Sequence, residues 1–239
     1  MGNRDLSYDK NAVSIITCTK RQKCMDTLFR NYARQSYRNK ELIVILNHKT
    51  LKITEYINAA RKHKNVRIYS LPDDISLGHC LNYGVERANC SFIAKFDDDD
   101  YYAPDYLTDS MRIQLKTNAD IVGKRAHYMY LGGKKLLLLR YPNKENQYVS
   151  LVQGATLLAK RHVFGQVKFP DLNRGECVKF CSAALSQGFS IYSASKSNFL
   201  AIRRRKSNNH TWIVSDQYLL TRNVKVLKVK NIRRFISKS

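Results

Sequence analysis

The chain has 239 residues, of which 44% are hydrophobic, and its 42 Lys and Arg against 19 Asp and Glu give a formal net charge of +23. This hydrophobic content is typical of a globular protein with a substantial core, and the longest unbroken aliphatic run, Leu136 to Leu139, is too short to span a bilayer. The six cysteines form no Cys-x-x-Cys pair and no disulfide framework, so we expect reduced thiols in a soluble, cytoplasmic protein whose basic surface attracts polyanions.

The first half of the chain alternates between predicted strands and predicted helices. A polar leader covers residues 1–11, and apolar runs typical of buried strands then alternate with segments whose apolar residues recur at helical spacing. In chain order these segments cover 12–17, 23–36, 42–46, 51–63, 66–70 and 77–87. Strand and helix in this order predict an α/β fold with a mostly parallel sheet that helices cover on both faces.

The second half has a different pattern, with a hairpin around a Gly-Gly turn and a helix that begins near Glu176 and ends at Gly188. The predicted elements cover 105–116, 121–122, 128–131, 136–141, 155–159, 176–188, 189–192 and 199–202. This mixture predicts a smaller, partly antiparallel half. We expect the two halves, 12–104 and 105–205, to form one domain, followed by a basic loop and tail over 206–239.

One apolar run, residues 92–96, ends in four consecutive aspartates, Asp97 to Asp100. Four adjacent carboxylates repel one another, so the cluster costs stability unless cations share it. Ligands collect at the carboxyl ends of strands in open α/β sheets, and hard oxygen ligands favour Mg²⁺ or Mn²⁺ together with substrate phosphates. The residues therefore indicate a metal and phosphate site, although a solvated acidic turn before a helix near Pro104 explains the same pattern.

Four segments follow one another along the chain in an informative order. They are Val13-Ser14-Ile15-Ile16, Glu41-Leu42-Ile43-Val44-Ile45, Leu77-Gly78 with Asn82-Tyr83-Gly84, and Phe96-Asp97-Asp98-Asp99-Asp100 with Pro104. Together they resemble the family 2 glycosyltransferases of the GT-A fold, in which a nucleotide-binding sheet is fused to an acceptor half. The resemblance covers about residues 12–205 and is nearest to bacterial members linked to cell-surface or spore-coat polysaccharide.

The resemblance implies an inverting transfer of a sugar from a nucleotide diphosphate donor, a UDP- or dTDP-sugar, with Mn²⁺ or Mg²⁺ as cofactor. Asp97 would contact the ribose, and Asp99 would ligate the metal that bridges the two phosphates. A metal suits this chemistry because the leaving nucleoside diphosphate gains negative charge as the sugar departs. Of the other two aspartates, Asp98 is expected to face solvent, and Asp100 either to tune the site or to face solvent.

Four further residues match nucleotide-side positions of the family. Thr17 and Thr19 lie where relatives contact the nucleotide, although an ordinary strand-end turn explains them nearly as well. Asn47 stands where the family has an Asp that accepts a hydrogen bond from the base, and its side-chain carbonyl can still accept one. Asn82 matches an Asn that faces the nucleotide site.

The sequence Arg174-Gly175-Glu176-Cys177 departs from the family's Gly-Glu-Asp, in which a carboxylate is the catalytic base. An inverting transfer needs such a base to take the proton of the acceptor hydroxyl. A buried thiol at Cys177 is a poor substitute, so the resemblance points to Glu176 as the base. Three alternatives stay open. Asp171 reaches into the site, or the chain is catalytically weakened, or Glu176 only occupies the first turn of a helix, where the helix dipole favours an acidic residue.

A late segment, Asn208-Asn209-His210-Thr211-Trp212, resembles a His-containing loop that folds over the donor in this family. His210 would then be a third metal ligand or a phosphate contact, and a structural or exposed histidine is the alternative. The implied partners are a nucleotide-diphosphate sugar donor and a glycan or lipid-linked acceptor. A peripheral contact with an anionic polymer, the inner face of a membrane or a spore surface is a further option.

Two other functions fit parts of the sequence. Cys177 and Leu46, which replace acidic residues of the family, suggest a catalytically weakened GT-A domain that binds nucleotides or glycans without turnover. The net charge suggests a nucleic-acid-binding protein. The chain has no zinc finger, RNP-like strand motif or basic heptad, so we expect no specific nucleic acid partner.

Overall fold

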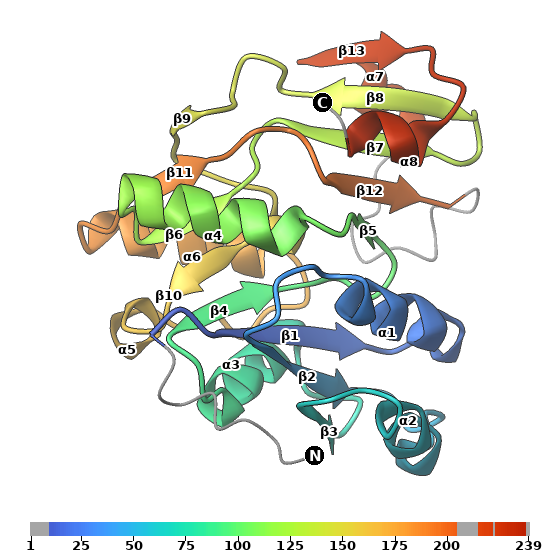
Figure 1. Ribbon diagram of the computed structural model, residues 1–239, viewed down its shortest axis with the longest axis vertical. Helices are drawn as coiled ribbons and strands as arrows, with labels where there is room; N and C mark the ends of the chain where they lie inside the picture. Colours follow the sequence, from blue (N-terminus) through green and yellow to red (C-terminus); the bar gives the residue numbers. More distant parts are fainter. Residues whose placement is uncertain (1–9, 205–214, 222, 238–239) are drawn as a thin grey trace.

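The computed structural model describes residues 10–204, 215–221 and 223–237, and the statements below refer to these residues. Figure 1 shows two sheets, one above the other along the long axis of the molecule, with helices packed around the larger, lower sheet. The larger sheet has the strand order β3-β2-β1-β4-β10-β6-β11-β9, and the smaller has the order β13-β8-β7-β12-β5.

The first four strands of the larger sheet are parallel. They are β3 (Val66–Ser70), β2 (Lys40–Leu46), β1 (Val13–Thr19) and β4 (Phe92–Lys95). Alternate side chains enter two separate cores, since Val13 and Ile15 pack into one core and Ile16 and Ile43 into the other. This burial on both faces explains why the strands are continuous apolar runs.

Helices cover both faces of this sheet, as the alternation of elements predicts. One face packs against α1 (Met25–Ala33), α2 (Ile53–Ala60) and α4 (Tyr106–Thr117). The other packs against α3 (Leu77–Arg87), the short α5 (Val163–Gln166) and α6 (Glu176–Ser186). The glycine expected to end the last long helix, Gly188, has a left-handed φ of +82°.

The order of the strands places a switch point beside β1. Strands β2 and β3 continue the sheet on one side of β1, and β4 lies on the other side, with Ile16 opposite Lys95 in the parallel ladder. The carboxyl ends of β1 and β4 are therefore neighbours. Ligands of open α/β sheets bind at such a point, and the four aspartates begin two residues after the end of β4.

Beyond β4 the larger sheet becomes mixed. It continues with β10 (Leu158–Lys160), β6 (Ile121–Gly123), β11 (Ile191–Ser193) and β9 (Gln147–Tyr148). Strand β10 is antiparallel to both of its neighbours, whereas β6 and β11 are parallel. The strand expected over 155–159 begins later, because residues Gly154–Thr156 form a 3-10 turn.

The smaller sheet contains the predicted hairpin and the predicted strand near residues 199–202. Its strands are β13 (Val224–Leu227), β8 (Leu136–Arg140), β7 (His127–Leu131), β12 (Phe199–Arg203) and β5 (Tyr101–Tyr102). The two-residue strand β5 was not predicted, and it joins the aspartate cluster to this second sheet through its antiparallel pairing with β12. The predicted α/β architecture with a mixed second half is therefore confirmed.

The end of the chain differs from the loop and tail expected over 206–239. Within that range the described residues form α7 (Asp216–Thr221), β13 and α8 (Ile232–Ile236). Strand β13 pairs with β8, and Ile236 is fully buried against the outer face of the smaller sheet. This strand and helix were not predicted, because their apolar residues stand singly among basic residues. These apolar residues form a core only by packing against the hairpin.

Candidate active site

The aspartate loop is fixed by an aromatic side chain beneath it. Tyr102 is fully buried and stacks on Phe96 at 3.8 Å between ring centroids. Its hydroxyl accepts a hydrogen bond from the Asp97 backbone N–H at 2.8 Å and donates one to the Ala155 carbonyl at 2.7 Å. The turn that presents the four carboxylates is therefore held to β4 on one side and to the Gly154–Thr156 turn on the other.

Asp98 does not face solvent, which corrects the expectation from the sequence. Its residue is 2% exposed, and its carboxylate accepts a hydrogen bond from Thr19 Oγ1 at 2.5 Å and forms an ion pair with Arg21. Burial raises the pKa of Asp98, and the Arg21 guanidinium opposes that rise. Asp98 therefore turns inward and ties the aspartate loop to the end of β1.

Asp100 is also buried, and it ties the same loop to the smaller sheet. Its Oδ1 accepts a hydrogen bond from the Ile202 backbone N–H at 2.8 Å, and its carbonyl accepts one from Asn31 Nδ2 at 2.8 Å. Burial, together with the charges of Asp99 and Asp97, raises the pKa of Asp100 well above its ordinary value. These contacts indicate a structural role in joining β12 and α1 to the loop.

Asp97 and Asp99 are left as the two more accessible carboxylates. The side chain of Asp97 is 39% exposed and that of Asp99 is 11% exposed. Asp99 Oδ2 lies 2.8 Å from Arg21 Nη1 and 3.9 Å from Arg204 Nη2. The four aspartates therefore form two pairs. Asp97 and Asp99 are the outer pair, which a ligand can contact, and Asp98 and Asp100 are the inner pair, whose contacts fix the loop.

The outer pair can hold a divalent metal only together with other ligands. Among the residues that the structure describes, no three His, Cys, Asp or Glu side chains converge as a metal site. Mg²⁺ and Mn²⁺ are commonly held by one or two carboxylates plus substrate phosphates, so this donor set fits a metal that arrives with a diphosphate. Asp99 would be the protein ligand. His210 lies outside the described residues.

Lys95 is a part of the site that the sequence analysis did not single out. It ends β4, its side chain is 8% exposed, and it forms an ion pair with Asp97. Burial alone would lower the pKa of Lys95, but Asp97, Cys177 and Glu176 raise it above its ordinary value, so the ammonium stays charged. A lysine in an otherwise apolar strand was the signal available in the sequence.

Glu176 and Cys177 begin α6 beside Lys95. Gly175, with a φ of +77°, leads into the helix, and Glu176 is 8% exposed. Cys177 Sγ donates a hydrogen bond to Glu176 Oε1 at 3.3 Å. Burial raises the pKa of Cys177 well above its ordinary value, so Cys177 is a neutral thiol that positions the neighbouring carboxylate and takes up no proton itself.

The remaining candidate residues have mostly structural contacts. Asn47 is 1% exposed, and its amide donates to the Pro72 carbonyl. Asn82 donates to the Phe169 carbonyl at 2.8 Å and accepts from the Phe169 N–H at 3.0 Å. Thr17 is buried within β1, and the alternative base Asp171 accepts a hydrogen bond from Ser76 at the start of α3. Of the four nucleotide-side residues, the structure brings only Thr19 into contact with the aspartate loop.

The fold and the aspartate loop define the class of protein. A mostly parallel sheet, covered by helices on both faces and followed at its switch point by the aspartate loop, is the GT-A fold of glycosyltransferases. The family model described as glycosyl transferase family 2 matches residues 14–164. The chain therefore belongs to glycosyl transferase family 2 and is a transferase.

Two curated relatives agree with this family. An uncharacterized glycosyltransferase of Haemophilus influenzae is 28% identical over 176 residues, 70% of this chain and 70% of its own length. The O-antigen biosynthesis glycosyltransferase WbnJ of Escherichia coli is 29% identical over 134 residues, 55% of this chain and 52% of its own length.

Solved structures share the fold at low identity. S. aureus TarS 1–349 in complex with UDP-GlcNAc matches with a TM-score of 0.65 and 19% identity, over 81% of this chain and 59% of that one. The mannosyltransferase PcManGT from Pyrobaculum calidifontis in complex with GDP-Man and Mn²⁺ matches with a TM-score of 0.62 and 14% identity, over 86% of this chain and 60% of that one. The chain thus spans less than two thirds of these two chains.

Proposed function

We propose that the protein transfers a sugar, with inversion, from a UDP- or dTDP-sugar to a glycan or lipid-linked acceptor. The observation that carries this proposal is the division of the aspartate loop, in which Asp98 and Asp100 are fixed inward while the more exposed Asp97 and Asp99 form ion pairs with Lys95 and Arg21. The UDP-GlcNAc complex of TarS, which has the same fold, supports a nucleotide-sugar donor.

On the donor side, Asp97 would contact the ribose and Asp99 would hold Mn²⁺ or Mg²⁺ beside the phosphates of the donor. The bound metal supplies positive charge that stabilises the nucleoside diphosphate as it leaves. Arg21 lies 2.8 Å from Asp99 and adds a second positive charge beside the same position. The Mn²⁺ in the mannosyltransferase complex supports a divalent cofactor.

On the acceptor side, Glu176 takes the proton of the attacking hydroxyl. The Cys177 thiol donates to its Oε1 and orients the carboxylate, and the charged Lys95 lies beside it. Because the acceptor attacks from the face opposite to the leaving diphosphate, the anomeric configuration inverts. This assignment gives Lys95 two tasks, since it also pairs with Asp97 on the donor side.

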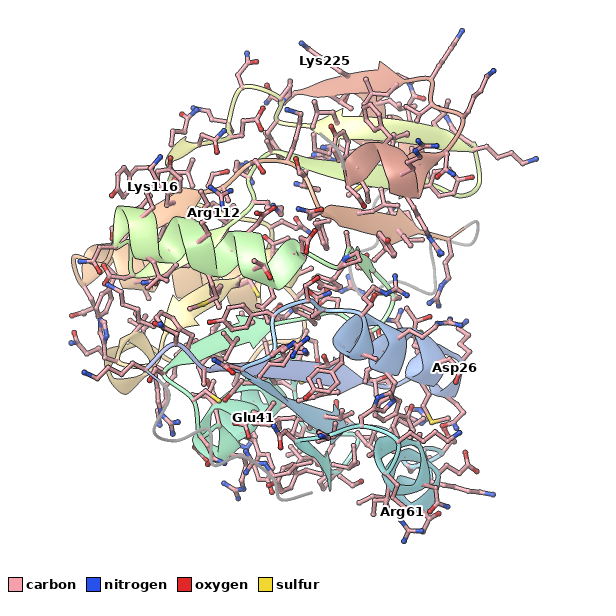
Figure 2. All side chains as sticks on the ribbon, in the orientation of Figure 1. Asp26, Glu41, Arg61, Arg112, Lys116 and Lys225 are labelled. Atoms are coloured by element: carbon pink, nitrogen blue, oxygen red, sulfur yellow. The ribbon has the colours of Figure 1, made fainter. Side chains whose placement is uncertain are left out.

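The acceptor is carried on an anionic surface or a lipid, in our proposal. Exposed basic residues gather at the end of the molecule formed by β13 and α8, namely Lys225, Lys228, Lys230, Arg233 and Arg234. Figure 2 shows Lys225 pointing away from the protein at this end. None of the described helices is long and apolar enough to cross a membrane. These exposed basic residues suit a peripheral electrostatic contact with such a surface.

A second candidate function is a nucleotide-sugar-binding module without turnover. It is favoured by one observation, the neutral and buried thiol of Cys177 where the family has a carboxylate. On this alternative Glu176 serves only to begin α6, where the helix dipole favours an acidic residue.

Thermal unfolding with UDP, dTDP and GDP, each with and without Mn²⁺, tests the donor site, because a ligand that binds the native state raises the melting temperature. We expect a rise with UDP or dTDP that requires Mn²⁺ and is lost in Asp99→Ala. A rise of equal size in Asp99→Ala would contradict the metal assignment. Hydrolysis of the matching nucleotide sugar by the wild type separates the transferase from the binding module, which would hydrolyse none until Cys177→Asp restores turnover.

A further inference from the structure

The inner face of the smaller sheet holds basic side chains that the proposed reaction does not use. His127 begins β7 and Arg140 ends β8, and the two residues lie directly opposite each other in the antiparallel ladder. They are 3% and 6% exposed. The charges of Arg140, Arg125 and Lys124 all act on the His127 ring. We call these four residues, Lys124, Arg125, His127 and Arg140, the basic cluster.

Polar atoms of the basic cluster are buried without a partner. Among the described residues, Arg140 Nε, Arg140 Nη1 and His127 Nε2 have no hydrogen-bond partner. Arg140 Nη2 donates a 3.4 Å hydrogen bond to Tyr141 Oη, and Arg140 Cζ lies 5.2 Å from the centre of the Tyr141 ring. A buried donor or acceptor that loses its water without gaining a partner costs about 1–3 kcal/mol, and more when it is charged. We therefore expect a bound ligand to supply the missing hydrogen-bond partners of these atoms.

The charge of the cluster indicates what kind of occupant fits. Among the described side chains, those of residues 10–204, 215, 217–221 and 223–237, no ion pair includes Lys124, Arg125 or Arg140. The carboxylates whose charges reach Lys124 have other contacts, since Asp109 accepts from Asn198 and Arg112, and Glu145 pairs with Lys196. A water molecule would supply hydrogen-bond partners but no negative charge. An anion supplies hydrogen-bond partners and negative charge.

The tautomer of His127 narrows the choice of anion. His127 Nδ1 lies 3.0 Å from the Arg125 carbonyl oxygen, which can only accept, so Nδ1 carries the proton and Nε2 of the neutral ring is an acceptor. Burial, and then the neighbouring positive charges, lower the pKa of His127 to about 4, which agrees with a neutral ring. The cluster thus offers two donors on Arg140 and one acceptor on His127.

We propose that the basic cluster is an anion site for hydrogen phosphate or a phosphate monoester. Hydrogen phosphate, or a phosphate monoester that keeps one proton, has bare oxygens for Arg140 Nε and Nη1 and a hydroxyl that can donate to His127 Nε2. Arg125 stacks 3.7 Å from the Tyr141 ring, and both side chains are half-buried, so they form the part of the site that reaches the surface. A small organic group attached to the phosphate would extend toward the surface beside Arg125 and Tyr141.

This site is separate from the aspartate loop, and its existence does not depend on the proposed function. Tyr106 and Phe199 stand between them, with Lys124 Nζ 5.5 Å from the Tyr106 ring and the His127 ring 6.3 Å from that of Phe199. Phe199 in turn packs on Tyr102, which holds the aspartate loop. Loss of one site by mutation can therefore be measured while the other is intact.

The test is thermal unfolding in millimolar sodium phosphate, sulfate or chloride at equal ionic strength. We expect saturating phosphate to raise the melting temperature of the wild type by roughly 5 °C, and sulfate, which has no proton to donate, to raise it less. Arg140→Met should lose the phosphate-specific rise. Arg125 is half-buried, so Arg125→Gln leaves the core in place. In this variant phosphate should raise the melting temperature by less than it does in the wild type. Arg61→Gln, at the other end of the molecule in Figure 2, makes the same change in net charge and should behave like the wild type.

Two further arms complete the test. In the first, glycerol 3-phosphate replaces inorganic phosphate. A rise in melting temperature at least as large as with inorganic phosphate assigns the site to a phosphoryl group on an organic carrier. A rise with inorganic phosphate alone assigns the site to the free ion. Diffraction from crystals soaked in phosphate should show a tetrahedral anion between Arg140 and His127. Water alone at that position, an equal shift in Arg140→Met, or equal shifts with sulfate and phosphate would overturn the proposal.

Discussion

Thr19 Oγ1 donates a 2.5 Å hydrogen bond to Asp98 Oδ2, joining residues that are 79 positions apart in the sequence. The contact joins the carboxyl ends of β1 and β4, where the switch point of the sheet lies. Arg21 binds the same carboxylate, so Asp98 is neutralised from one side and hydrogen-bonded from the other. Asp99 is held at the surface of the site because its neighbour is fixed in this way.

Thr19→Val should therefore loosen the aspartate loop. The substitution keeps the shape of the side chain and removes the hydroxyl, which leaves one oxygen of a buried carboxylate with less support, at a cost of about 1–3 kcal/mol. Chemical denaturation measures this loss, and nucleotide titration should show weaker binding. Thr54→Val on the exposed face of α2 is the matched control and should stay within about 0.5 kcal/mol of the wild type. Equal stability of the two variants would show that the Thr19 contact has no energetic role.

Glu176→Gln should lower kcat by about 10²–10⁴-fold, because an amide cannot take up the proton of the acceptor hydroxyl. The amide still accepts the hydrogen bond from Cys177, so nucleotide binding and the melting temperature should change little. Single-turnover transfer with a saturating donor gives the rate. Glu86→Gln, an exposed glutamate of α3, is the control for the loss of one charge. A Glu176→Gln variant that keeps its full rate would exclude Glu176 as the base.

Gly78→Ala should destabilise the protein, because α3 begins against the chain that leads to α6. A Cβ on Gly78 would lie 1.8 Å from the Pro170 carbonyl oxygen, so backbone must move. Overpacking of this kind costs typically about 1–3 kcal/mol. Gly165→Ala in α5 is the matched control, since a Cβ there meets nothing within 4 Å. We expect it to be neutral or to stabilise by up to about 1 kcal/mol. Equal free energies of unfolding for both variants would contradict the close approach.

The stability of the fold should fall as the pH drops from 6.5 toward 4, in part because of His127. Its pKa is lowered to about 4 in the folded protein, so between these values the unfolded chain binds the proton that the folded chain excludes. The shift corresponds to about 3 kcal/mol over the whole window. His127→Phe should flatten the dependence in phosphate-free buffer, whereas His79→Phe, at an exposed position of α3, should keep the wild-type slope. An unchanged slope in His127→Phe would show that His127 is not the group that titrates.

Much of the larger sheet was predictable from the chain. Its strands are apolar on both faces, and each helix between them has one apolar side, so periodicity alone located them to within a few residues. Strands β5 and β9 were missed because each has two residues and exists only through pairing with a distant partner. The Asp-x-Asp pattern located the candidate site, but the expectation for Asp98 was wrong.

The sequence alone determined the fold class and the position of the carboxylates at the end of a buried strand, because both follow from local periodicity. Only the tertiary structure decided which of four adjacent aspartates turn inward. In a loop of identical residues the direction of each side chain depends on the partners that reach it, and those come from Thr19, Arg21 and the Ile202 N–H, far away in the chain. The same holds for the burial of Lys95, His127 and Arg140, because the sequence around a basic residue does not show which distant elements pack against it.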